Sequence, residues 1–362
     1  MTPTLDELTA RIESMAPAAR AKLLAEVGKS MARHIWMPLP GPQTMAYKSQ
    51  ADVVGYGGSA GGGKSDLAIG KALMRHHEVL IMRREATQLK GILRRMEQIL
   101  GSRDGYNGQD RRWSKAGPRE VDIEFGSCPN LGDETKHQGN PHDLLVLDEA
   151  TNFLESQVNF LLGWNRTVRE GVHCQALMAF NPPTSIEGRW VVAFFGPWLD
   201  VRHDLYPTAP GVLRYCVTVP GDNESYRYVW VEDARPCVLI DGEIEYDFDP
   251  AEYRPEDIVV PQSRTFIPSR ISDNPHLAKS GYMRVLQAMP EPLRSQLLYG
   301  DFQAGMTDDP WQVVPTAWVE AAMARWTPRS PRGEMLSMGC DVARGGKDNT
   351  IIATRHKAGE SA

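Results

Sequence analysis

One glycine-rich stretch constrains this chain more than any other feature of its sequence. Residues 58–65 fit the pattern G-x-x-x-x-G-K-[ST], with a short apolar segment before them and an amphipathic segment at 64–75 after them. In such a loop, glycines let backbone N–H groups turn around phosphate oxygens, the lysine reaches the β- and γ-phosphates, and the serine hydroxyl takes a position on Mg²⁺. The sequence therefore predicts a nucleotide-binding loop made of Gly58, Ser59, Ala60, Gly61, Gly62, Gly63, Lys64 and Ser65.

The segments around this loop alternate between strand and helix patterns. Strands are expected at 52–56, 79–82, 121–125, 144–147 and 176–180, and helices at 64–75 and 88–100. This alternation is typical of an α/β fold with a mainly parallel sheet that helices cover on both faces. From residue 197 the chain becomes β-rich, and Asp241-Gly242 predicts a tight hairpin. We interpret 197–262 as an antiparallel insertion.

Polar side chains follow two of the expected buried strands. Asp148 and Glu149 come directly after 144–147, and Asn181 ends the strand at 176–180. Because ligands bind at the carboxyl ends of parallel strands, we expect Asp148 in the Mg²⁺ shell and Glu149 as the residue that orients and deprotonates the attacking water. Asn181 is placed to contact the γ-phosphate or that water. The alternatives are acidic residues that cap a helix and a plain Asn-Pro turn.

Phosphoryl transfer also needs a cation that stabilises the transition state. We favour Arg84, which follows the strand at 79–82. For each arginine near the expected site, a solvated surface position is the alternative. The other candidates are Arg83, Arg94, Arg95, Arg166 and Arg169.

Composition narrows the function only a little. The 362 residues carry a net charge of −6, which argues against a protein that coats DNA but not against one that grips it through a local basic patch. No apolar run reaches the length that spans a bilayer, and the start lacks a signal-peptide pattern. The five cysteines show no metal-ligand or redox spacing, and we interpret them as reduced thiols of a cytoplasmic protein.

Several further segments, in this order, resemble motifs of one family. They are Met82-Arg83-Arg84 with Leu89, Lys136-His137-Gln138-Gly139, Phe180-Asn181-Pro182-Pro183, Ser272-Asp273-Asn274-Pro275 with Leu277, Gly281-Tyr282, and Leu298-Tyr299-Gly300-Asp301-Phe302. Together with the glycine-rich loop and the acidic pair, they resemble the large terminase subunits of tailed bacteriophages over roughly residues 36–350.

The resemblance implies a P-loop NTPase of the additional-strand, catalytic-glutamate type with a small helical lid. It implies ATP hydrolysis with Mg²⁺ that drives double-stranded DNA into a procapsid, by a homo-oligomeric ring at the portal that works with a small terminase subunit. The location would be the host cytoplasm and, transiently, the capsid portal, with no membrane partner. By the same resemblance, Gln43 would contact adenine.

Two positions depart from the family pattern. Ser59 and Ala60 stand where some relatives carry an arginine inside the loop, so the transition-state cation would come from elsewhere, such as a neighbouring subunit. Residues 337–350 resemble the first strand and turn of a ribonuclease H-like nuclease, with Asp341 as its first metal ligand. Since the chain ends at Ala362, we expect this nuclease part to be incomplete and inactive.

The expected domain organisation follows from these segments. It comprises N-terminal helices at 1–35, an ATPase core at 36–262, a lid at 263–326, a linker at 327–335 and the start of the nuclease at 336–362. Two alternatives stay open, namely another P-loop DNA translocase or helicase and a nucleotide-binding structural subunit with little turnover. Candidate DNA contacts are the basic clusters at 111–115 and 325–332, for which a solvated charged face is the alternative.

Overall fold

The computed structural model describes residues 34–220, 226–304, 333–341 and 351–357, together with residues 12, 14–23 and 26 and the single positions 314, 318 and 322. The chain divides into two compact units, Met1–Gly305 and Met306–Ala362. Most of the expected N-terminal helices lie outside the described residues, although 17–23 are helical. Within the described part, no helix is both long and apolar enough to cross a membrane.

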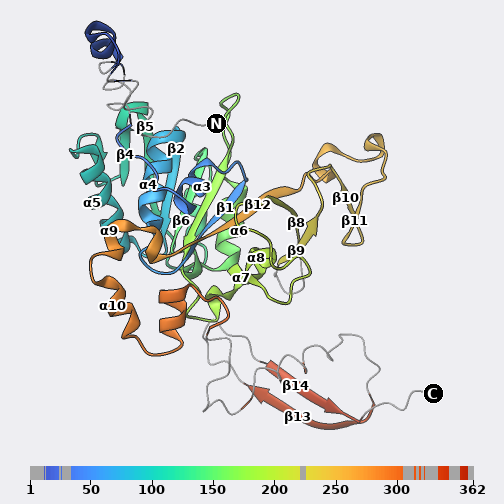
Figure 1. Ribbon diagram of the computed structural model, residues 1–362. Coiled ribbons are helices and arrows are strands. Elements are labelled where there is room, and N and C mark those ends of the chain that lie inside the picture. Colours follow the sequence, from blue (N-terminus) through green and yellow to red (C-terminus); the bar gives the residue numbers. More distant parts are fainter. Residues whose placement is uncertain are drawn as a thin grey trace. The chain divides into compact units, whose positions relative to one another are not determined.

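The larger unit is built on a ten-stranded sheet with the order β3-β4-β5-β2-β6-β7-β1-β12-β8-β9 (Figure 1). Its centre is parallel and consists of β5 (Val121–Ser127), β2 (Glu78–Arg83), β6 (Leu144–Asp148), β7 (Gln175–Phe180), β1 (Val53–Gly58) and β12 (Gln262–Ser269). An antiparallel pair extends each edge: β3 (Tyr106–Asn107) with β4 (Arg112–Ala116), and β8 (Arg214–Pro220) with β9 (Tyr226–Val231). The predicted α/β class with a mainly parallel sheet is confirmed.

Helices bury both faces of this sheet, because successive side chains of a strand point in opposite directions. Val54 of β1 belongs to one apolar cluster, whereas its neighbour Val53 belongs to the other. The first cluster includes residues of α3 (Pro42–Lys48), α4 (Lys64–Arg75) and α5 (Leu89–Leu100). The second includes residues of α6 (Glu155–Gly163), α7 (Trp190–Phe194) and α8 (Gly196–Leu199).

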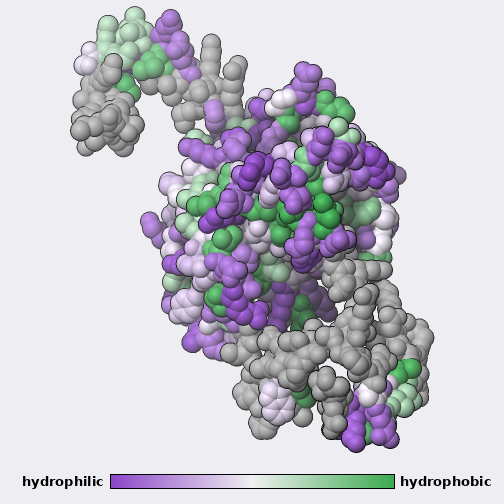
Figure 2. Space-filling model, turned by 90° about the vertical axis from the view of Figure 1, so that its right-hand side faces the viewer, coloured by the Kyte–Doolittle hydropathy of each residue, from purple (hydrophilic) through white to green (hydrophobic). Residues whose placement is uncertain are grey.

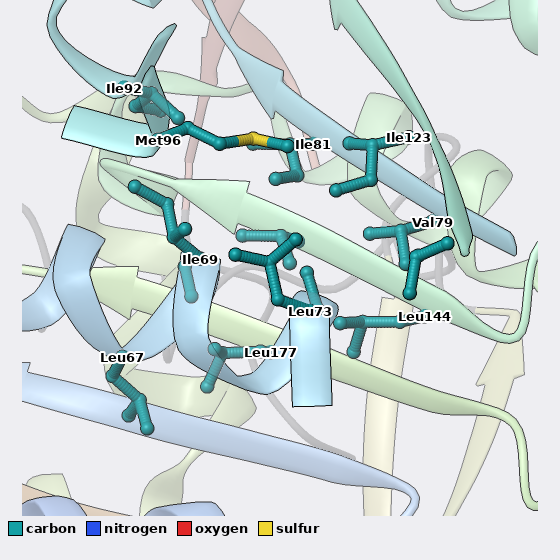
Figure 3. Packing of buried hydrophobic residues seen from close by; sticks show 14 of the residues in the cluster. Leu67, Ile69, Leu73, Val79, Ile81, Ile92, Met96, Ile123, Leu144 and Leu177 are labelled. Carbon is teal, nitrogen blue, oxygen red and sulfur yellow. The ribbon is translucent and has the colours of Figure 1, made fainter. Parts of the chain in front are cut away.

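Helix α4 begins at the glycine-rich loop of residues 58–65, called the phosphate-binding loop below after its predicted role. The packing of α4 fixes the position of its first turn. In Figure 3, side chains of α4 lie against those of the central strands, with Ile92 and Met96 of α5 beside them. The labelled contributors are Leu67, Ile69 and Leu73 from α4 and Val79, Ile81, Ile123, Leu144 and Leu177 from the strands. All of these residues are at most 3% exposed, so the helix start is held by buried contacts on several strands.

The β-rich region expected as an antiparallel insertion contains antiparallel strands that extend the main sheet. β8 and β9 continue the main sheet, since β8 pairs with β12 through Gln262 and Cys216. The predicted hairpin is confirmed: β10 (Val238–Ile240) and β11 (Glu243–Glu245) pair in antiparallel fashion around Asp241-Gly242. On the face shown in Figure 2, hydrophilic and hydrophobic residues are mixed.

The expected start of the lid at residue 263 is also different in the structure. Residues 262–269 form β12, which pairs with β1 in parallel, and its Phe266 and Ile267 are buried. The helical part therefore begins after Ser269, the last residue of β12. It contains α9 (Pro275–Ala278), α10 (Tyr282–Gln287) and a π-helical turn at Ser295–Tyr299.

In the second unit, β13 (Met335–Asp341) and β14 (Ile351–His356) form an antiparallel hairpin. The strand expected to start near Met335 is confirmed. Whether this hairpin begins a nuclease remains a prediction, as does the rest of the domain organisation.

Gly57 provides a test of the close contact between β1 and β7. A Cβ at Gly57 would lie 2.0 Å from the Phe180 carbonyl oxygen, a backbone atom that cannot turn away. We expect Gly57→Ala to destabilise the protein by about 1–3 kcal/mol, as overpacking does in rigid cores. In contrast, Gly91→Ala in the exposed interior of α5, with no atom within 4 Å of the added carbon, should stabilise by about 0.5–1 kcal/mol. Urea unfolding of both variants checks the two signs.

Candidate nucleotide site

A cavity of about 860 Å³ lies beside the phosphate-binding loop, where several parallel strands end. The loop follows β1, Glu149 follows β6, and Asn181 follows β7. Most of the predicted site residues thus meet at one edge of the sheet. The cavity is lined by Gln43, Ala60, Gly61, Gly62, Gly63, Lys64, Ser65, Glu149 and Asn181, and by Trp36, Asp66, Arg95, Asn274, His276, Leu277 and Tyr282 among others.

The loop has a fixed shape because its glycines take conformations that other residues avoid. Gly61 and Gly63 have φ of 83° and 79°, in the left-handed region. Gly62 has no room for a side chain, since a Cβ there would lie 2.4 Å from the Ser269 hydroxyl oxygen. The buried Tyr56 hydroxyl donates a hydrogen bond of 2.9 Å to the Gly62 carbonyl. The strand before the loop and β12 therefore both hold it in place.

Lys64 is buried and points back into the loop. Its ammonium group donates to the Ser59 carbonyl at 2.9 Å and to the Asn181 side-chain oxygen at 2.6 Å. Burial lowers the pKa of Lys64, while the carboxylates of Glu149 and Asp148 oppose that shift. Two strand-end loops are thus linked by one buried cation that a phosphate group could also engage.

Ser65 and Asp148 provide two hard oxygen donors at the same place. The Ser65 hydroxyl donates to Asp148 Oδ2 at 3.0 Å, and Asp148 is 1% exposed. Mg²⁺ usually takes one or two protein oxygens and completes its shell with phosphates and waters, so this donor pair fits the ion. No cluster of three or more His, Cys, Asp or Glu residues is found in the described part of the chain, and a site of this kind does not need one.

Glu149 faces the cavity from a strained backbone. Its φ is 57°, an uncommon value for a non-glycine residue. Burial raises the pKa of Glu149, and the Asp148 carboxylate adds to that effect, whereas Lys64 and Arg83 oppose it. Such an environment raises the proton affinity of the carboxylate, as a general base requires.

The structure places Arg84 away from this cavity. Its guanidinium donates to the Gln157 side chain of α6 at 2.7 Å, so our preference for Arg84 as the transition-state cation finds no geometric support. Its neighbour Arg83 reaches the site instead and donates to Asp148 Oδ2 at 2.6 and 2.9 Å. The side chains of adjacent residues at the end of a strand point to opposite faces of the sheet. This explains why Arg83 reaches Asp148 whereas Arg84 reaches Gln157 of α6.

Gln43 lies in the cavity wall, but its side-chain amide is already engaged. Its oxygen accepts from the Leu39 backbone at 2.6 Å, and its nitrogen donates to the Gly63 carbonyl at 3.0 Å. In this structure Gln43 therefore links the segment before α3 to the loop. Contact with adenine remains a prediction.

Sequence reasoning missed an acidic bridge at the cavity wall. Asp66 accepts from the Trp36 indole at 2.8 Å and from Arg95 at 2.5 Å, and thereby joins α4, α5 and the segment before α3. Arg95 is one of several candidate cations in the sequence. The sequence does not show that its guanidinium lies next to Asp66 in the fold. Of the other candidates, Arg169 pairs with Glu78 at 3.4 Å, and Arg166 lies over the Trp164 ring.

The helical segment after β12, the predicted lid, contacts the loop through backbone and side-chain hydrogen bonds. Ala60 donates to the Leu297 carbonyl at 2.7 Å, Ile271 donates to the Ser59 hydroxyl at 2.8 Å, and Asn274 donates to the Gly61 carbonyl at 2.8 Å. In the sequence, the segments 272–275 and 298–302 resemble parts of a lid. In the structure, Asn274 of the first segment and Leu297, which precedes the second, contact the loop.

Asp341 is the last residue of β13, in the second unit, and its role as a metal ligand remains a prediction. Of the candidate DNA contacts, Arg112 pairs with Asp122 at 3.4 Å, and the cluster at 325–332 lies outside the described residues.

No protein-family model matches the chain, and no curated protein does. Solved structures of phage large terminases do match. The large terminase of the thermophilic bacteriophage D6E in complex with ADP is 15% identical, with a TM-score of 0.43 over 88% of this chain and 64% of that one. The Thermus phage P74-26 large terminase ATPase domain is 16% identical, with a TM-score of 0.41 over 72% of this chain and 93% of that one. The HK97 bacteriophage large terminase is 12% identical, with a TM-score of 0.32 over 44% of this chain and 36% of that one.

These matched structures come from the family that the motifs resemble. This chain spans 64% of the length of the D6E protein.

The raised pKa of Glu149 leads to a prediction about stability. At pH 8 the folded state holds an ionised carboxylate that its surroundings disfavour, so Glu149→Gln should raise the melting temperature. As pH falls through the folded-state pKa and then the unfolded one, the carboxyl becomes neutral in both states and the difference should vanish. Melting curves of both proteins from pH 8 to pH 4 test this. Glu85→Gln, at an exposed position, is the control and should show no such trend; a gap that is constant with pH would contradict the assignment.

Gln296 leads to a second prediction, about the lid. This residue is 4% exposed, and its amide donates to the carbonyls of Pro183 and Ala304 at 3.1 and 3.0 Å. Gln296→Met keeps the volume but leaves both carbonyls without that donor, which should destabilise the protein by about 1–3 kcal/mol. Gln303→Met removes a single bond, to the Leu199 carbonyl, and should have the smaller effect in urea unfolding. Equal effects would show that the double contact adds nothing.

Proposed function

We propose that this chain is the ATP-hydrolysing motor of viral genome packaging, the ATPase part of a large terminase subunit. The observation that carries the proposal is the convergence of Lys64, Ser65, Glu149 and Asn181 on one cavity beside a glycine-rich loop, with Asp148 hydrogen-bonded to Ser65 behind it. Each of these side chains has a separate task in phosphoryl transfer, and a structural subunit would need none of them in this arrangement.

The proposed roles follow from the contacts. The loop amides and Lys64 would hold the β- and γ-phosphates of ATP at the start of α4, whose positive end favours the anion. Mg²⁺, held through Ser65 and Asp148, would neutralise charge on the phosphate oxygens. Lys64 would exchange its bond to Asn181 for one to a phosphate oxygen, so that Asn181 is released toward the γ-phosphate or the water.

Glu149 would act as the general base. Its carboxylate lies in the cavity next to Asp148, and its raised pKa increases its capacity to take a proton from water. The same shift predicts that turnover falls as pH decreases through that pKa, because the protonated carboxyl cannot accept the proton.

Among the described residues, the arginines nearest the cavity already have side-chain partners. Arg83 is engaged by Asp148, Arg84 by Gln157 and Arg95 by Asp66. A neighbouring subunit would then supply the arginine, which supports a proposed homo-oligomeric ring. In the proposed setting, the ring assembles at the portal of a procapsid in the host cytoplasm, works with a small terminase subunit and translocates double-stranded DNA.

Steady-state ATP hydrolysis across a range of protein concentrations tests the proposal. We expect the specific activity to rise with concentration in the presence of Mg²⁺, because each site would borrow a cation from its neighbour. Glu149→Gln should lower kcat by about 10²–10⁴-fold while nucleotide binding persists, as loss of a general base does. Glu85→Gln serves as the exposed control.

Two outcomes would separate the alternatives. Bound ATP without turnover in either protein at every concentration would favour a nucleotide-binding structural subunit. Turnover that is independent of concentration but lost in Glu149→Gln would keep the ATPase and remove the ring argument.

A further inference from the structure

A second cavity lies at the opposite edge of the sheet from the phosphate-binding loop. Its volume is about 280 Å³, and it is found where α4 ends and where β2 and β7 begin. Among the described residues, no aspartate or glutamate lines it. Its charged and polar lining includes Arg75, His76, His77, Arg119, His173 and Gln175.

Two arginines at this cavity have no carboxylate partner within the described part of the chain. Arg75 lies over the Tyr47 ring at 5.4 Å, and one Arg119 nitrogen lies 3.0 Å from His77 Nε2. The exposed arginines on the β10–β11 side of the molecule differ, because Arg235 and Arg254 each bond to an aspartate. The positive charge of Arg75 and Arg119 is therefore available to a ligand.

His76 adds a buried polar atom without a hydrogen bond. The residue is 6% exposed, and its Nδ1 has no hydrogen-bond partner among the described residues. The nearest carboxylate, Asp143, is 3.8 Å away. Burial lowers the pKa of His76 to about 3, and the cations Lys71, Arg75 and His173 contribute to that shift. This nitrogen is buried on the side of Asp143, so His76 forms part of the cavity wall, and the hydrogen-bond donors that reach the cavity are those of the arginines.

The carboxylates nearest this cavity are hydrogen-bonded within the fold, and one of them to the lining residue His173. Asp143 accepts from the backbone of His77 and Glu78, at 2.9 to 3.2 Å. Asp52 accepts from His173 at 2.6 Å and from Ser263. The carboxyl end of α4 adds partial negative charge, which Arg75 in its last turn offsets. Since no carboxylate of the described residues lines the cavity, the two arginines bring positive charge to it without an acidic side chain beside them.

We propose that this cavity binds a phosphate group. A phosphate presents several strong acceptor oxygens, and guanidinium groups match them with paired N–H donors. The group could come from free phosphate or from the phosphodiester backbone of a nucleic acid, since both offer the same oxygens. This site is separate from the nucleotide cavity, and its existence does not depend on the proposed ATPase activity.

Histidine NMR reports on this cavity directly. In protein with ¹³C-labelled histidine, inorganic phosphate is titrated at pH 8 and constant ionic strength, and a mixed-sequence DNA duplex is titrated in a parallel sample. The ring signals of His77 and His173 are assigned by single His→Gln variants. These two signals should move in a saturable way, whereas that of His276, at the nucleotide cavity, should not follow the same curve.

The matched variants decide whether the arginines are responsible. Arg75→Gln/Arg119→Gln should weaken the apparent affinity by about tenfold or more, as expected when charge-assisted hydrogen bonds are lost. Arg235→Gln/Arg254→Gln changes the net charge equally and should leave the affinity unchanged. All four arginines are exposed, so folding is not at stake.

The two titrations also distinguish the sources. Saturation by free phosphate indicates a small-anion site, whereas saturation by the duplex alone indicates a backbone contact, and either supports the proposal. Absence of a saturable shift with both ligands, or equal weakening in the two double variants, overturns it.

Discussion

The buried ammonium group of Lys64 is the interaction on which the nucleotide cavity depends. A cation so poorly exposed must have partners, and it finds them in the Ser59 carbonyl of its own loop and in Asn181 at the end of β7. The carboxylates of Asp148 and Glu149 stand close enough to oppose the loss of its charge. Three strand ends, of β1, β6 and β7, therefore share one electrostatic centre, and the parallel sheet is what brings them to the same edge.

The segment at 295–304 connects this centre to the junction with the second unit. Leu297 accepts from the Ala60 backbone, and Gln296 joins Pro183 to Ala304. Phe302 packs against Phe180, the residue before Asn181, with ring centroids 5.9 Å apart. One short stretch thus touches the phosphate-binding loop and the loop after β7, and then continues to the boundary at Gly305.

Local sequence patterns predict the helices and strands correctly where the buried positions repeat with the period of the helix or strand. The helix at 64–75 and the strands around the acidic pair lie where expected, because their apolar positions repeat with the period of the element and end at a glycine or a charged residue. The pattern failed where pairing is non-local. β12 was assigned to the lid, since nothing within residues 262–269 reveals that they pair with β1, and the edge strands β3 and β4 were not foreseen because they are short and mostly polar.

For the site, the sequence predicts which residue types take part but not the direction in which each side chain points. The sequence located the loop, Asp148, Glu149 and Asn181, since each follows a recognisable strand. It could not choose between Arg83 and Arg84, because that choice depends on which side of the sheet each side chain leaves from. Nor could it show that the amide of Gln43 is engaged twice, or that Asp66 joins Trp36 to Arg95.

The two edges of the sheet differ in how their charges are compensated. At the carboxyl edge, cations and carboxylates are paired closely: Lys64 lies near Glu149 and Asp148, and Arg83 bonds to Asp148. A ligand that enters there must exchange bonds, so its arrival necessarily rearranges protein contacts. At the amino edge, Asp143 and Asp52 are bonded to the fold itself, and Arg75 and Arg119 are left with an aromatic ring and an imidazole as neighbours. An anion there would add bonds without breaking any, which suits a site that holds a ligand rather than one that changes state with it. Under the two proposals, the sheet would separate a site whose ligand exchanges bonds with the protein from a site whose ligand only adds bonds.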